Sequence, residues 1–188
     1  MTGIDSFAVS LMAGLLSVAP APSAQIPGWT EADALETLRS EGLSDVRDTT
    51  VDPRFPDIQG YTPQGFPVSL VRMACSSTAP DPADTCRGIW ITAVLPSTEE
   101  RWATKIIDSL ERNANGPPGV HAHISRMVTE TGQQAPVVVL SSYLVADGGV
   151  SARLLPYQVS YFLGIVEQTS SFMLSDDPGH AELWAPEP

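Results

Sequence analysis

The feature that most constrains the fold is a pair of strand-like stretches joined by a short loop with a cysteine at each end. Residues 66–75, FPVSLVRMAC, and 86–96, CRGIWITAVLP, alternate apolar and other side chains with the period of two that is typical of a β-strand. The loop between them, SSTAPDPADT, is rich in proline and aspartate, which favour turns. The sequence therefore predicts an antiparallel β-hairpin with Cys75 and Cys86 at matching ends.

Cys75 and Cys86 are the only cysteines of the chain, and the predicted hairpin favours a disulfide between them. A zinc site usually pairs its cysteines about two to four residues apart, whereas these have ten residues between them. A catalytic redox pair is expected as C-x-x-C, which this spacing is not. Unpaired structural thiols are one alternative, and metal or redox chemistry is another. A disulfide would indicate an oxidising compartment.

The first 24 residues differ from the rest of the chain. Phe7 to Ala19 is an uncharged, mostly apolar run that is too short to span a bilayer as a helix and is typical of a signal-peptide core. We predict cleavage between Ala24 and Gln25, although no Lys or Arg precedes the run and Pro22 stands where a small residue is usual. Export would make the protein periplasmic or secreted in a bacterium, without stable membrane insertion after processing. The alternatives are a misplaced start codon and an amphipathic arm of a cytosolic protein.

Composition limits the classes of function. The chain has 188 residues, 43% of them hydrophobic, which suits one core of ordinary size and a single domain. It carries 22 acidic and 10 basic residues, a net charge of -12, and the basic residues are spread singly. Such a chain repels phosphate backbones, so we expect no nucleic-acid partner. The expected organisation is a signal peptide at 1–24, one domain at 25–174 and a flexible acidic tail at 175–188.

Other segments predict helices and strands on both sides of the hairpin. Thr30 and Asp33 can form a capping box at the start of a helix that Gly42 ends, and Ser97 with Glu100 can start a second helix. The remaining predicted elements are strands at 46–51, 120–129 and 136–145, a third helix at 156–173 and a loop at 52–65. This order, α-βββ-α-ββ-α, predicts an α+β fold with a five-stranded antiparallel sheet and helices on one face.

The residues from about 30 to 174 resemble the YbjN-domain family, described as bacterial sensory transduction regulators. The resemblance rests on the order of the elements and on four stretches, ALETLRSEGL, IQGYTPQGFPVSLVRMAC, CRGIWITAVLP and LSSYLVADGGVSARLLPYQVSYFLGIV. Many relatives have an asparagine-rich, tryptophan-bearing segment where this chain has NGPPGVHAHISR, so no role of that segment is carried over. The resemblance implies a type III secretion chaperone-like fold and a binding or regulatory module, and it transfers no catalytic residue.

The common motifs of catalytic and cofactor sites are absent from the chain, including G-x-S-x-G, G-x-x-x-x-G-K, G-x-G-x-x-G and H-E-x-x-H. His121 and His123 are the nearest candidates for a metal site, because side chains two apart on a strand share one face. Nothing in the sequence brings a third ligand to them, since His180 falls in the predicted tail. We therefore expect them to form an exposed polar strand face, and we expect no metal, no cofactor and no catalytic residue.

The function expected from these observations is that of an exported, non-enzymatic protein-interaction or regulatory module. Its partner would be another protein, and a homodimer formed through the second helix is a further candidate, by analogy with secretion chaperones of similar fold. The alternative is a small-ligand binding domain with its site between the sheet and the helices.

Overall fold

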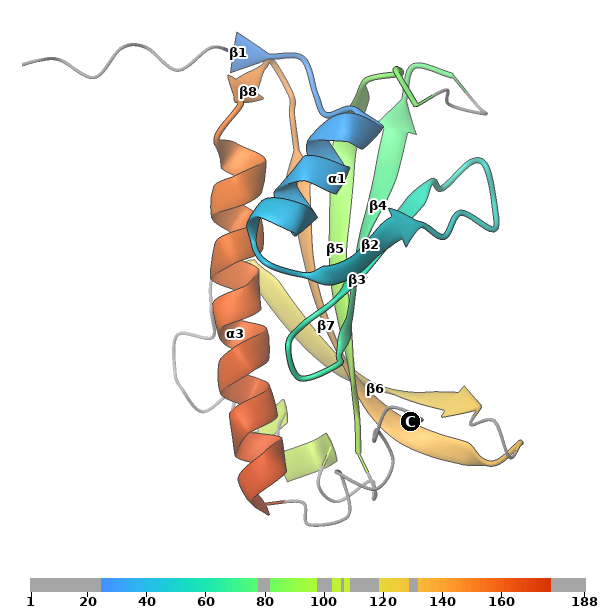
Figure 1. Ribbon diagram of the computed structural model, residues 1–188, viewed down its shortest axis with the longest axis vertical. Helices are drawn as coiled ribbons and strands as arrows, with labels where there is room; N and C mark the ends of the chain where they lie inside the picture. The colour runs from blue at the N-terminus through green and yellow to red at the C-terminus, as the bar shows by residue number, and fades with distance from the viewer. Residues whose placement is uncertain are drawn as a thin grey trace, which may run out of the picture.

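The computed structural model describes residues 25–77, 82–97, 103–105, 107–108, 119–128 and 132–176. Within these residues, six strands form one antiparallel sheet (Figure 1). In spatial order the strands are β2 (Ser44–Asp48), β3 (Asp57–Tyr61), β4 (Pro67–Cys75), β5 (Cys86–Pro96), β7 (Gln134–Val145) and β6 (Val120–Val128). Two further strands, β1 (Gln25–Ile26) and β8 (Val150–Ser151), pair with each other in a small separate sheet.

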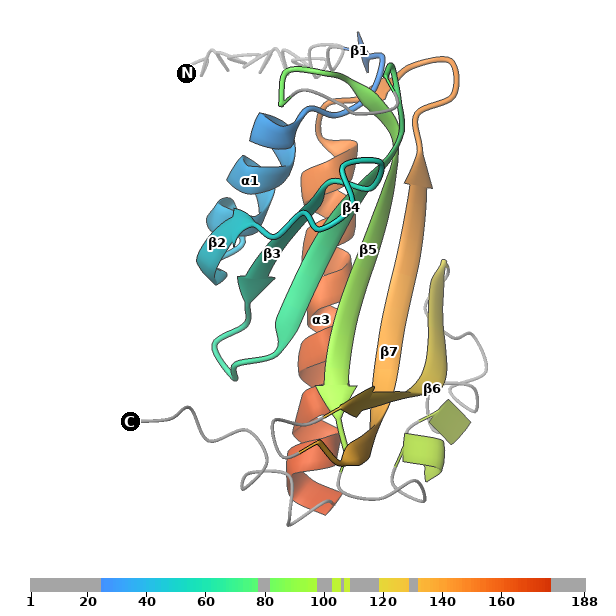
Figure 2. The same ribbon diagram turned by 90° about the vertical axis from the view of Figure 1, so that its right-hand side faces the viewer.

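The helices α1 (Glu31–Ser40) and α3 (Leu154–Asp176) cover one face of the large sheet. Figure 2 shows α3 running along the sheet behind strands β4 and β5. The core lies in this layer, where Ile91 of β5 and Leu140 of β7 pack in one cluster with Val159 and Phe162 of α3. The sheet and its helices therefore form two layers. We call the sheet face away from the helices the outer face.

The helix α1 begins and ends as its sequence predicts. The Thr30 hydroxyl accepts a hydrogen bond from the Asp33 backbone N–H, and the Asp33 carboxylate accepts one from the Thr30 N–H at 2.8 Å, which completes the capping box. Gly42 follows the helix with a φ of 81°, a conformation that glycine adopts without strain.

The α+β class, the antiparallel sheet and the hairpin of β4 and β5 are confirmed, but the predicted number of strands in the sheet was wrong. The additional strand is β3, which lies inside the segment predicted as a loop. Its Gly60 packs so closely under the chain after α1 that a Cβ there would come within 3.0 Å of Val46 and 3.1 Å of Leu43. Glycine at this position therefore serves close packing of a strand and does not mark a turn.

Two predicted elements shift and one falls largely outside the described residues. The first strand of the sheet, predicted at 46–51, lies at Ser44–Asp48, and the last helix, predicted at 156–173, extends over Leu154–Asp176. Of the predicted second helix, residues 103–105 and 107–108 are helical, and its capping residue Glu100 lies outside the described residues.

Candidate functional site

The predicted disulfide between Cys75 and Cys86 is present, and it joins two residues that face each other across β4 and β5. Their Cα atoms are 3.8 Å apart. Cys86 uses its backbone N–H and C=O on the opposite side, where both bond to Trp29. Cys75 and Cys86 therefore form a non-hydrogen-bonded pair, the arrangement in which cross-strand side chains lie closest.

The segment before α1 is fixed to the hairpin at Cys86. The Trp29 N–H donates to the Cys86 carbonyl at 2.9 Å, and the Cys86 N–H donates to the Trp29 carbonyl at 2.9 Å. A Cβ at Gly28 would collide with that same carbonyl of Cys86, so this close approach requires glycine. The disulfide, the hairpin and the start of α1 therefore form one unit.

Arg72 ties the same unit together from inside the core. Its guanidinium is fully buried, and it donates to the Glu31 carboxylate at 3.1 Å and to the Asp84 carbonyl at 3.3 Å. Its Nη1 also lies 4.0 Å from the Cys86 sulfur. Arg72 lies on the same strand face as the buried Val68 and Leu70, but the alternation of residues along the strand did not reveal an ion pair with α1.

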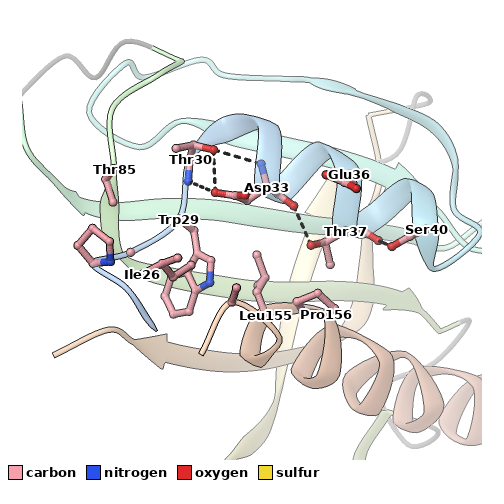
Figure 3. A pocket seen from close by; sticks show the side chains of 13 residues that line it. Ile26, Trp29, Thr30, Asp33, Glu36, Thr37, Ser40, Thr85, Leu155 and Pro156 are labelled. Atoms are coloured by element: carbon pink, nitrogen blue, oxygen red, sulfur yellow. Dashed lines mark hydrogen bonds between the residues drawn. The ribbon is translucent and has the colours of Figure 1, made fainter. Parts of the chain in front are cut away.

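A groove lies between α1 and the beginning of α3, next to this unit (Figure 3). Its volume is about 390 Å³. Its lining residues are Ile26, Pro27, Gly28, Trp29, Thr30, Asp33, Glu36, Thr37, Ser40, Thr85, Ala152, Leu155 and Pro156. The sequence did not predict this groove, because it is formed by segments that are more than one hundred positions apart in the chain.

The outer face of the sheet carries an aromatic patch, which we define as Val71, Met73, Trp90, Tyr143 and Val145. Trp90 and Tyr143 are cross-strand partners, with 41% and 50% of their surface exposed. The Tyr143 hydroxyl lies over Gly88, where a Cβ would come within 2.6 Å of it. Aromatic side chains so exposed on a sheet face are typical of binding surfaces.

Asp57 ends the same cross-strand row, beyond Val71. Its Oδ2 accepts a hydrogen bond from the Thr49 hydroxyl at 3.2 Å, whereas its Oδ1 is buried without a hydrogen-bond partner in the described structure. Burial raises the pKa of the Asp57 carboxyl, and the nearby Asp48 carboxylate raises it further, against the hydrogen bonds from Thr49 and Ser69. The outer face therefore contains a partly buried acidic group beside an apolar patch.

His121 and His123 lie on the outer face of the edge strand β6, paired with Ser141 and Val139. Both are exposed, as expected for a polar strand face. Within the part of the chain that the structure describes, they belong to no group of three or more residues that could hold a metal ion. His180 and Ala24, the latter on one side of the predicted cleavage site, lie outside that part.

Among known proteins, a similarity is found at the level of the fold. No family model matches the chain, and no curated protein matches it. Among solved structures, "Crystal structure of YbjN, a putative transcription regulator from E. coli" matches with a TM-score of 0.52 and 12% sequence identity, covering 87% of this chain and 100% of that one. At this level of identity, the likeness shows that the two proteins share a fold.

Proposed function

We propose that the protein is a non-enzymatic protein-interaction or regulatory module of the YbjN type. The observation that carries this proposal is the aromatic patch on the outer face, where Trp90 and Tyr143 are half exposed. Large aromatic side chains supply much of the binding energy in protein interfaces. The shared fold with YbjN, described as a transcription regulator, supports the regulatory reading.

We further propose that the protein is exported to the periplasm or secreted. The apolar run at 7–19 supports this, and so does the Cys75–Cys86 disulfide, since such bonds persist mainly in oxidising compartments. Among the described helices, none has the length and apolar character needed to cross a membrane. Intact mass of the protein from a bacterial envelope fraction tests the proposal: we expect a chain that starts at Gln25 and gains two hydrogens on reduction. A chain that retains Met1 and two alkylatable thiols would contradict it.

The interaction proposal is tested by capture of partners from a periplasmic extract with three baits. The wild type should capture a partner, and the double variant Trp90→Ser, Tyr143→Ser should lose it. Tyr157→Ser is the matched control, because Tyr157 is 69% exposed but lies on α3, on the other side of the sheet. Repeated failure of the wild type at high bait concentration, or equal capture by the double variant, would contradict the proposal.

Light scattering tests the homodimer, which a monomer at high concentration would exclude.

A second candidate function is that of a small-ligand binding domain, which the groove beside α1 favours. The site expected from the sequence was between the sheet and the helices, whereas the groove lies between α1 and the start of α3. A ligand that binds only the folded protein raises its apparent stability by mass action, so a thermal shift screen of small metabolites tests this function.

A further inference from the structure

The groove beside α1 has features that indicate a class of ligand, an inference that rests on the second candidate function. Its volume of about 390 Å³ is in the range of sites for small organic molecules. One wall is formed by α1 and the other by the first turn of α3, with the residues before α1 between them (Figure 3). A ligand there would contact three separate parts of the chain.

The charged residues that line the groove are both acidic. Asp33 and Glu36 are exposed, and no Lys, Arg or His is among the lining residues. Asp33 receives both Thr30 hydrogen bonds on Oδ2, and Glu36 makes no hydrogen bond or ion pair within the described residues. Because the whole chain also carries a net charge of -12, the groove favours a cation.

Trp29, one of the residues that line the groove, has a buried hydrogen-bond donor without an acceptor. Trp29 is 1% exposed, and its indole N–H has no partner in the described structure. Figure 3 shows the nitrogen edge of the ring facing Leu155, which also lines the groove. An unpaired buried donor is unfavourable, and a ligand that supplies an acceptor would remove this cost.

We propose that the groove binds a small organic amine that carries a hydrogen-bond acceptor beside an apolar group, the chemistry of an amino-acid amide. The ammonium group is attracted by Asp33 and Glu36, and the acceptor receives the Trp29 N–H once the Leu155 side chain that this N–H faces moves aside. The apolar group packs against Leu155 and Pro156. Each part of this ligand matches a feature that the folded protein leaves unsatisfied or exposed.

Three probes that share the same isobutyl side chain separate the parts of this proposal. Leucinamide has both the amine and the acceptor, isoamylamine lacks the acceptor, and N-acetyl-leucinamide lacks the positive charge. Each is titrated into the oxidised full chain carrying ¹⁵N-labelled tryptophan, and the indole N–H resonance of Trp29, assigned with Trp29→Phe, is followed. We expect leucinamide to shift this resonance saturably, and the other two probes to bind at least roughly tenfold more weakly.

The variant Glu36→Gln should weaken leucinamide binding several-fold. Glu41→Gln is its matched control, because Glu41 caps the same helix but does not line the groove, and the charge change is identical. Equal binding by the two variants, or binding of N-acetyl-leucinamide as tight as that of leucinamide, would overturn the proposal even if Trp29→Phe fails to fold.

The outcomes also distinguish this inference from the function on which it rests. If compounds of a different chemical class shift the Trp29 resonance and leucinamide does not, the small-ligand function stands and the amine proposal fails. If no compound of a broad library shifts Trp29 or raises the melting temperature, both fail. The interaction function of the outer face is unaffected by either result, since it is tested through Trp90 and Tyr143.

Discussion

The two faces of strand β5 differ sharply although they belong to one backbone with one set of hydrogen bonds. On the inner face, Ile89, Ile91 and Leu95 are fully buried under the helices. On the outer face, Trp90 pairs with Tyr143 and both keep about half of their surface exposed. The inner row therefore determines stability, while the outer row is free to carry a binding function at small cost to the fold.

The largest effect on stability is expected from a substitution on the inner face of β5, compared with one on its outer face. Ile91→Ala removes a fully buried side chain and leaves a cavity, so we expect it to lower the free energy of unfolding by about 4 kcal/mol. Trp90→Ala removes an exposed aromatic pair and should cost about 1 kcal/mol. Urea denaturation measures both. A loss at Trp90 as large as that at Ile91 would show that the aromatic patch is part of the structural core.

Loss of the disulfide should have the second largest effect on stability, because the bridge stabilises the hairpin that both faces share. The two cysteines are 11 positions apart, and opening so short a loop should lower stability by about 3 kcal/mol in the chain-entropy model. Denaturation of the protein with and without reductant, and of the Cys75→Ala, Cys86→Ala double variant, measures this. Agreement between the reduced protein and the double variant is the control, and an unchanged midpoint on reduction would contradict the prediction.

The buried ion pair on the inner face should be the next most sensitive feature. Glu31→Gln leaves the fully buried Arg72 guanidinium without its carboxylate, and we expect a loss of about 2 kcal/mol. Glu36→Gln is the matched control on α1 and should change stability by less than about 0.5 kcal/mol. The double variant Glu31→Gln, Arg72→Met should recover part of the loss. A larger loss in the double variant than in Glu31→Gln would contradict the assigned role of the pair.

The smallest effect concerns the one partly buried carboxyl described on the outer face. Burial raises the pKa of Asp57, so the native state holds its proton to higher pH than the unfolded chain does. Ionisation of this carboxyl group therefore lowers stability as pH rises from the pKa of the unfolded chain, about 3.9, through the pKa of the folded state. Asp57→Asn should be slightly more stable than the wild type at pH 7, and this difference should vanish at lower pH.

Asp52 supplies a control of opposite sign for this pH dependence. The Arg54 guanidinium donates hydrogen bonds to Asp52 and lowers its pKa, so its contribution is present at neutral pH and disappears as pH falls through the folded pKa. Asp52→Asn should therefore be no more stable than the wild type at pH 7. Parallel pH profiles of the two variants would contradict the assignment of Asp57.

Local patterns in the sequence were sufficient to predict the hairpin, the disulfide and the start of α1. The period-two alternation of 66–75 and 86–96 identified the strands, and the spacing of Thr30 and Asp33 identified the cap. Strand β3 was missed because Gly60 and the surrounding prolines are typical of loops, whereas here the glycine allows the chain after α1 to pack against the strand. Its structural role depends on a tertiary contact that local propensity does not express.

The candidate sites follow the same division. The aromatic patch arises from strand register, so the alternation of residues along β5 could have indicated which side chains lie opposite the core. The groove could not be predicted, because Glu36 and Leu155 come together only when α1 and α3 pack on the sheet. The buried, unpartnered N–H of Trp29 likewise depends on what surrounds it in the folded protein.

The two backbone hydrogen bonds between Trp29 and Cys86 also have a consequence for the order in which the parts of the domain fold. Trp29 is synthesised 57 positions before Cys86, so its backbone groups have no strand to pair with until the hairpin has been made. Closing so long a loop is slower than forming the local β4–β5 turn. The hairpin should therefore form first, and the segment before α1 should dock on it last. The groove would then be complete only when the rest of the domain is folded.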